Sequence, residues 1–150
     1  MTREEKCLLA IEKGFTYNPE TGKIYGITGK EIVGKHSAGY TRIAFKFNKK
    51  KYELNAHIFA YYFVYKKCDK DIDHINGIRD DNRITNLRSV TRQQNNFNRK
   101  YVKGYFFCKQ TNKYKVTICH NYKILYIGLY NTEEEARDAY LKAKEKYHVI

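Results

Sequence analysis

Apolar and polar residues alternate along the chain in patterns that predict short strands and helices. Ile43, Phe45 and Phe47 alternate with Arg42 and Lys46, which predicts a strand with one buried and one basic face. The predicted elements, in chain order, are a short helix within residues 2–14, hairpins over 15–25 and 40–54, a helix over 56–67, strands over 71–75 and 86–90, a helix over 92–100, strands over 105–109, 114–120 and 123–130, and a helix over 132–147.

The last fifty residues carry the clearest pattern, three strands followed by one helix. Thr132 and Glu135 match a capping box, and Ala136, Tyr140 and Ala143 recur on one helical face. We therefore expect this helix to cover one side of a three-stranded antiparallel sheet. Together with the amino-terminal hairpins and their helix, this arrangement predicts an α+β fold.

Charge identifies the class of partner. The formal net charge is +13, with 29 Lys and Arg against 16 Asp and Glu. Residues 82–132 contain ten Lys or Arg and no acidic residue, whereas an ordinary solvated surface mixes both signs. A stretch of one sign favours a polyanion, so nucleic acid is the expected partner and its binding should weaken with salt.

Several other classes of protein are excluded by the same sequence. The longest apolar or aromatic run, residues 58–65, is far shorter than the roughly 20 residues of a membrane span, and the charged amino end does not resemble a secretory signal. We expect a cytoplasmic location and no membrane partner. The four cysteines lie far apart without a C-x-x-C pair, which predicts reduced thiols rather than a zinc site or a redox motif.

Four polar residues have the spacing of a hydrolytic site. Asp73 and His74 end one predicted strand, Asn86 begins the next, and Asn95 lies inside a polar helix where asparagine is a weak helix former. A carboxylate and an amide oxygen suit Mg²⁺ or Mn²⁺. A histidine can take a proton from water, and an asparagine carbonyl on the facing strand can fix which ring nitrogen accepts it. An Asp-His dipeptide alone is more often a capping residue beside a solvated ring.

Residues 71–98 resemble the signature of HNH endonucleases, in the homing and nicking enzymes of phage type. The resemblance implies a ββα-metal finger over 71–100, with Asp73 and Asn95 as metal ligands, His74 as general base and Asn86 as its orienting partner. The third letter of the signature is Asn here rather than His, as in an H-N-N variant, which favours a hard cation. His57 is typical of the family and is expected to be structural.

Residues 104–148 resemble the Apetala-type (ethylene-response-factor) DNA-binding domain, whose three-stranded sheet enters the major groove. Tyr105 and Tyr126 stand where that domain usually has tryptophan. The chain thus divides into a basic β module (1–55), an HNH nuclease core (56–100) and this domain (104–148). The residues expected to contact DNA are Arg42, Lys46, Arg88, Arg92, Arg99, Lys100, Lys113, Lys115 and Thr117.

The sequence therefore predicts a metal-dependent HNH endonuclease that cuts double-stranded DNA, acts as a monomer and needs no small-molecule cofactor. A site-selective homing or nicking enzyme is the expected type. One alternative is a DNA-binding protein whose nuclease finger is inactive. Another is a nuclease of RNA or of DNA without site preference, although a dedicated sheet domain would then have little purpose.

Overall fold

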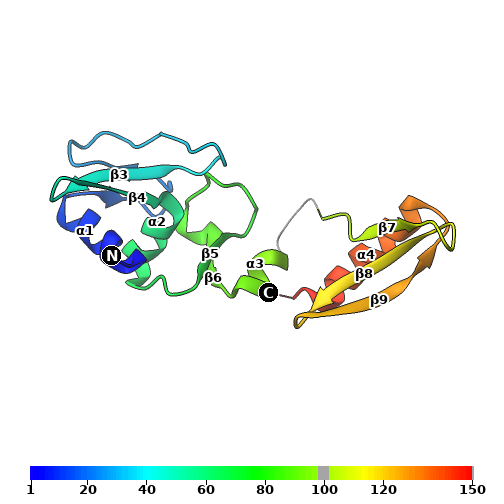
Figure 1. The fold of residues 1–150 in the computed structure, drawn as a ribbon. Helices are drawn as coiled ribbons and strands as arrows, with labels where there is room; N and C mark the ends of the chain where they lie inside the picture. The colour runs from blue at the N-terminus through cyan, green and yellow to red at the C-terminus, as the bar shows by residue number, and fades with distance from the viewer. Residues whose placement is uncertain (98–101, 150) are drawn as a thin grey trace. The chain divides into compact units, whose positions relative to one another are not determined.

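The computed structural model describes residues 1–97 and 102–149, which divide into two compact units, Met1–Arg92 and Gln93–Ile150. Elements of the first unit are α1 (Arg3–Glu12), β1 (Thr16–Tyr17), β2 (Ile24–Tyr25), β3 (Arg42–Phe47), β4 (Lys50–Asn55), α2 (Ala56–Tyr65), β5 (Asp71–His74), the 3₁₀ turn η1 (Ile84–Asn86) and β6 (Leu87–Val90) (Figure 1). The division falls within α3 (Arg92–Phe97), and the second unit continues with β7 (Tyr105–Cys108), β8 (Lys113–His120), β9 (Lys123–Tyr130) and α4 (Glu133–Tyr147).

All strand pairs in the described residues are antiparallel. β1 pairs with β2, β3 with β4, and β5 with β6, while β7, β8 and β9 form one sheet in that order. Small antiparallel sheets combined with helices are the α+β arrangement that the sequence predicts. Several boundaries differ by one or two residues, and one of these concerns the site, because the strand predicted to begin at Asn86 begins at Leu87 and Asn86 ends the 3₁₀ turn.

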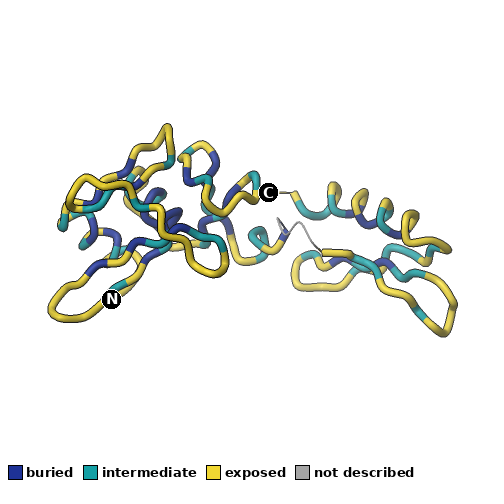
Figure 2. The backbone as a smooth tube through the Cα atoms, turned by 90° about the horizontal axis from the view of Figure 1, so that it is seen from above, coloured by how far each residue is buried: buried dark blue, intermediate teal, exposed yellow. Residues whose placement is uncertain are grey.

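One hydrophobic core holds the first unit together. Ile43 of β3, Phe59 of α2, Ile72 of β5 and Leu87 of β6 are all buried in it. Figure 2 draws buried stretches of the chain in dark blue. This core therefore runs across residue 55, where the sequence placed a boundary between a β module and a nuclease core. Free thiols also contribute to it, since Cys7 and Cys68 are buried and unoxidised, as expected.

Helix α2 is buried differently from its predicted pattern. The spacing of Ile58, Phe59, Tyr62 and Tyr65 predicts an amphipathic helix. Tyr65 is exposed, however, and five consecutive residues, Ala56–Ala60, are buried. The first half of the helix is enclosed because it packs against α1, β4 and β5. A helix surrounded by neighbours does not need a polar face.

Helix α1 fixes the chain just before β5. The Arg3 guanidinium donates to the Lys70 carbonyl at 3.2 Å, and the Glu4 carboxylate accepts from the Cys68 backbone N–H at 2.9 Å. Thr2 and Glu5 form a full capping box at the start of this helix. The first helix therefore anchors the strand that carries Asp73 and His74.

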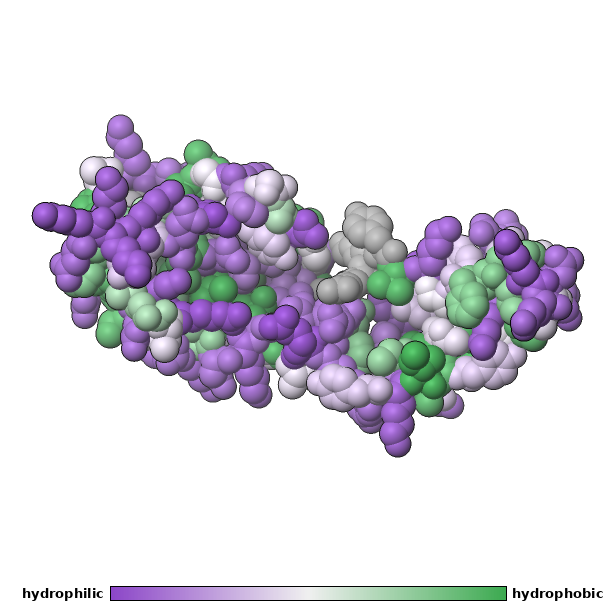
Figure 3. Space-filling view, in the orientation of Figure 1, coloured by the Kyte–Doolittle hydropathy of each residue, from purple (hydrophilic) through white to green (hydrophobic). Residues whose placement is uncertain are grey.

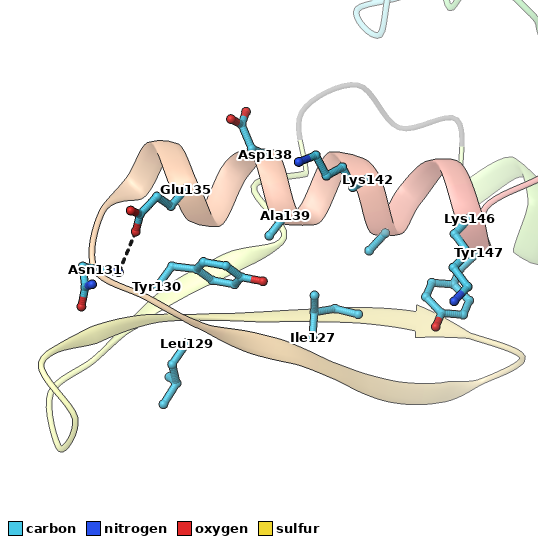
Figure 4. A pocket seen from close by; sticks show the side chains of 11 residues that line it. Ile127, Leu129, Tyr130, Asn131, Glu135, Asp138, Ala139, Lys142, Lys146 and Tyr147 are labelled. Atoms are coloured by element: carbon cyan, nitrogen blue, oxygen red, sulfur yellow. Dashed lines mark hydrogen bonds between the residues drawn. The ribbon is translucent and has the colours of Figure 1, made fainter.

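The second unit is a three-stranded sheet packed on one helix, as predicted. Val116 and Ile118 of β8 are buried against Ala136, Tyr140 and Ala143 of α4. The Thr132–Glu135 capping box forms, and the Glu135 carboxylate also accepts from the Asn131 backbone N–H at 3.0 Å, so α4 begins directly over the end of β9 (Figure 4). None of the helices within residues 1–97 and 102–149 has the length and apolar character of a membrane span.

Gly104 lies directly against the ring of Tyr140, and its φ of +77° is in the left-handed region. A Cβ there would lie 2.0 Å from Tyr140 Cδ2. Gly104→Ala is therefore expected to destabilise the second unit by more than the roughly 1–2 kcal/mol of a left-handed residue alone. Amide hydrogen exchange of the buried β8 residues measures this loss.

Gly29→Ala is the matched control, because Gly29 has a similar φ of +74° but no atom within 4 Å of an added Cβ. The effect of Gly29→Ala on amide hydrogen exchange in the first unit therefore measures the cost of backbone strain alone. Equal losses for the two substitutions would contradict the packing of Gly104 on Tyr140.

Candidate active site

Antiparallel pairing of β5 with β6 sets the position of Asp73. In this register Asp73 lies opposite Arg88, and the Arg88 guanidinium donates to Asp73 Oδ2 from Nη2 at 3.0 Å and from Nε at 3.2 Å. The Asp73 side chain is 11% exposed. Arg88 was predicted to contact DNA, but here its guanidinium forms an ion pair with the predicted metal ligand.

His74, the predicted general base, lies in a buried aromatic cluster. Its residue is 4% exposed, and its ring centroid lies 4.9 Å from that of His57 and 6.0 Å from that of Tyr40. Nε2 lies 3.3 Å from Asn82 Oδ1. Burial lowers the pKa of His74 below its ordinary value, and the hydrogen bond to Asn82 opposes this shift. The ring is therefore neutral at neutral pH, the form that accepts a proton.

Asn86 holds the loop between the two strands. Its Oδ1 accepts from the Asn76 backbone N–H at 3.0 Å, and its Nδ2 donates to Asn76 Oδ1 at 3.0 Å and to the Asp81 carbonyl at 2.8 Å. Among the described residues, these bonds engage both ends of its amide and none of them reaches the His74 ring. The sequence predicted a direct contact with His74, but the amide that makes this contact belongs to Asn82.

His57 is the neighbour of His74 that the sequence treated as structural. It is 6% exposed, and its Nδ1 has no hydrogen-bond partner among the described residues. The centroid of the Tyr40 ring lies 5.1 Å from that of the His57 ring, and the Arg79 guanidinium lies over the Tyr40 ring, 5.3 Å from its centroid. Burial, with a smaller contribution from the nearby His74, lowers the pKa of His57 to about 3. His57 therefore packs as a neutral aromatic ring.

The donor chemistry of the two predicted metal ligands fits a hard cation. Asp73 offers a carboxylate and Asn95 an amide oxygen, and Mg²⁺ commonly takes one or two protein oxygens and fills its other positions with water and phosphate. Asn95 lies on α3 and is half-buried in the second unit, so its partnership with Asp73 stays a prediction. The described part of the chain contains no group of three or more His, Cys, Asp or Glu that could hold a metal.

The residues predicted to contact DNA lie in different settings. Arg42 forms an ion pair with Glu53 on the neighbouring strand, and Arg92 Nε lies 3.0 Å from Asp71 Oδ2. Lys46 and Lys113 are exposed, Lys115 and Thr117 are half-buried on β8, and Arg99 and Lys100 lie outside the described residues. Hydrophilic side chains cover much of the first unit's face in Figure 3.

The side of the sheet away from α4 carries more apolar side chains than the predicted DNA contacts Lys113, Lys115 and Thr117 indicate. In the strand register Phe106, Lys115 and Leu129 lie opposite one another, as do Thr117 and Tyr126. Leu129 points away from α4 in Figure 4. We call this surface the outer sheet face, and its members are Phe106, Lys115, Thr117, Ile124, Tyr126 and Leu129.

Aromatic rings flank the central lysine of the outer sheet face. Lys115 Nζ lies 5.9 Å from the Phe106 centroid and 5.7 Å from the Tyr126 centroid, within the range of cation–π attraction. Phe106 is 53% exposed, Tyr126 58% and Ile124 77%. Alternation along β9 indicates that Ile124 and Tyr126 share this face, but the predicted DNA contacts on the sheet were only Lys113, Lys115 and Thr117.

Comparison with known proteins identifies the segment that holds the site. Residues 55–97 match the family model of the HNH endonucleases. A solved structure described as "DNA binding and cleavage by the HNH homing endonuclease I-HmuI" aligns at 31% identity over 56% of this chain and 50% of that chain, with a TM-score of 0.47. The chain thus spans half the length of that protein, and no curated protein matches it. The segment that contains Asp73, His74, Asn86 and Asn95 is therefore similar to the HNH endonucleases.

The burial of neutral His57 predicts a dependence of stability on pH. Its pKa falls from 6.5 to about 3 on folding, so the unfolded chain binds one more proton between these values. The stability that neutral His57 contributes is present above pH 6.5 and is lost as the pH falls toward 3. His57→Phe keeps an aromatic ring and should make the midpoint of urea unfolding less sensitive to pH over this range.

His36→Phe is the control for this experiment, because His36 is exposed in the same unit. It should retain the pH dependence of the unsubstituted protein. An unchanged pH dependence in His57→Phe would show that His57 is not held neutral by burial.

Proposed function

We propose that this protein is a metal-dependent endonuclease that hydrolyses phosphodiester bonds in double-stranded DNA. The observation that carries the proposal is that Asp73 and His74, consecutive residues at the end of β5, supply a carboxylate and a neutral imidazole. This pair lies within the segment that matches the HNH endonucleases. A homing or nicking enzyme is the type that the sequence resemblance favours.

Each residue of the site has a role in the proposed reaction. His74 accepts a proton from the attacking water, and its neutral ring is the form that can do so. Asp73 and Asn95 would hold Mg²⁺ or Mn²⁺, and the bound ion would stabilise the charge on the leaving oxygen. Arg88 fixes the orientation of the Asp73 carboxylate, and Asn86 fixes the loop that joins the two strands.

The proposed DNA surface combines positive charge with exposed rings. Residues 82–132 have no acidic residue, and Lys115 lies at the centre of the outer sheet face. Lysine neutralises phosphate, while exposed aromatic and apolar side chains contact bases and sugars. We infer that residues 104–148 are a DNA-binding module of the Apetala type and that the protein acts as a monomer.

A DNA-binding protein with an inactive nuclease finger is the second candidate. The ion pair between Arg88 and Asp73 favours it, because a carboxylate bound to a guanidinium attracts a cation less strongly. The 4% exposure of His74 also restricts the approach of water. Assays of cleavage and of binding on the same variants separate the two candidates.

His74→Ala should lower the cleavage rate by roughly 10² to 10⁴, the usual contribution of a general base, with DNA affinity nearly unchanged. The measurement is relaxation of supercoiled plasmid in Mg²⁺, alongside duplex binding by fluorescence anisotropy. His74→Gln provides a second variant that keeps a polar side chain of moderate size in the buried cluster.

Addition of EDTA is the control for metal dependence, and it should abolish cleavage by the unsubstituted protein without preventing binding. Equal cleavage with EDTA would contradict the assignment of Asp73 and Asn95 as metal ligands. Binding without any cleavage in Mg²⁺ or Mn²⁺ would favour the inactive finger.

Lys115→Met should weaken binding to a duplex and reduce the slope of log affinity against log salt by about 0.9, the value for one phosphate contact. Fluorescence anisotropy over a series of salt concentrations measures both quantities. Lys142→Met is the matched control, because Lys142 is exposed on α4, on the opposite side of the sheet. If both variants reduced the slope equally, the outer sheet face would not be the DNA surface.

A further inference from the structure

Asn82 is a buried amide in direct contact with His74. Asn82 is 5% exposed, and its Oδ1 lies 3.3 Å from His74 Nε2. Its Nδ2 donates to the Asp80 carbonyl at 3.3 Å, which can only accept a hydrogen bond. The orientation of the amide is thereby fixed, and the atom that faces the imidazole is the oxygen.

We propose that Asn82 is the positioning residue of His74 and that the first hairpin holds Asn82 in place, an inference that rests on the proposed nuclease function. An amide oxygen only accepts, so Nε2 of the neutral ring must donate. The proton on Nε2 leaves the lone pair on Nδ1. Asn82 therefore selects the tautomer in which Nδ1 is the basic atom.

The backbone of Asn82 is fixed by the hairpin of β1 and β2. The Tyr17 hydroxyl donates to the Asn82 carbonyl at 2.7 Å in a buried hydrogen bond, and this ring also packs edge-on against Phe63 of α2. Two residues further on, the Ile84 backbone N–H donates to the Pro19 carbonyl at 3.1 Å. Bonds to the hairpin thus hold the carbonyl of the Asn82–Arg83 peptide and the N–H of the peptide that follows it.

Gly22 brings the turn of this hairpin into contact with the same peptide. A Cβ on Gly22 would lie 2.6 Å from the Arg83 backbone nitrogen and 2.8 Å from the Asn82 carbonyl carbon. Backbone atoms cannot move aside as a flexible side chain can, and the φ of Gly22 is +74°. Only glycine allows this approach, so the turn supports the Asn82–Arg83 peptide directly.

The loop between β5 and β6 is consequently held from two directions. Asn86 bonds to Asn76 and to the Asp81 carbonyl from inside the strand pair, whereas Tyr17 and Pro19 bond to the end of the loop from the first hairpin. The hairpin was predicted to belong to a separate basic module. Its contacts also make it part of the support for His74.

Nitrogen-15 NMR of the full chain labelled in its histidine rings tests the proposal. The chain has five histidines, and His74→Gln assigns the His74 signals. At about pH 8, where ordinary imidazoles are neutral, His74 should show a protonated Nε2 and an unprotonated Nδ1. Asn82→Ala should give a mixture of both tautomers, and Asn82→Asp, which keeps an acceptor, should restore the single one.

Cleavage assays on the same variants provide the second readout. Asn82→Ala should lower kcat roughly 10- to 100-fold, the usual effect of removing a group that orients a functional histidine, with KM nearly unchanged, and Asn82→Asp should recover part of this loss. Tyr17→Phe keeps the ring and removes only the bond to the Asn82 carbonyl, so it should give a smaller change in the same direction. Glu12→Gln, a substitution of an exposed residue of α1, should leave both readouts unchanged.

The outcomes separate this inference from the function on which it rests. A single Nε2–H tautomer that persists in Asn82→Ala, or a protonated Nδ1 in the unsubstituted protein, would overturn the role of Asn82. Wild-type behaviour of Tyr17→Phe in both readouts would overturn the role of the hairpin, and this variant also tests the proposal if Asn82→Ala does not fold. Absence of cleavage by the unsubstituted protein would overturn the proposed nuclease function. The tautomer measurement would still decide whether Asn82 positions the His74 ring.

Discussion

Antiparallel pairing of β5 with β6 places Asp73 opposite Arg88 and His74 opposite Leu87, and the geometry of the site depends on this register. Successive residues of a strand face opposite sides, so adjacent Asp73 and His74 enter different surroundings. Asp73 meets a guanidinium near the surface, while His74 enters the aromatic cluster. A shift of one residue would exchange these surroundings and place a carboxylate among buried rings.

Two buried imidazoles in contact constrain the chemistry of the first unit. Charging both His57 and His74 would place like charges side by side in a region of low dielectric, so folding favours the neutral form of both rings. Neutral His74 is the form required of a base. Burial therefore both stabilises the fold and keeps His74 in the protonation state that the proposed reaction needs.

The sequence predicts those parts of the structure whose signals are local. The capping box of Thr132 forms as predicted, and Val116 packs against the helix that was expected to cover one side of the sheet. The contact of Asn82 with His74 was not predicted, because it depends on how an aperiodic loop folds against a hairpin sixty residues earlier. Similarly, the sequence could not show that Arg88 pairs with Asp73, since this depends on strand register.

The two rings beside Lys115 also affect the entropy of any complex that uses it. A lysine side chain in solution samples many rotamers, and most of that freedom is lost when its ammonium group is fixed on a phosphate. Lys115 extends between Phe106 and Tyr126, whose π faces already attract the ammonium group and restrict its rotamers in the free protein. A lysine ordered in this way loses less conformational entropy on binding than one extended into solvent, so the outer sheet face is preorganised for an anionic ligand.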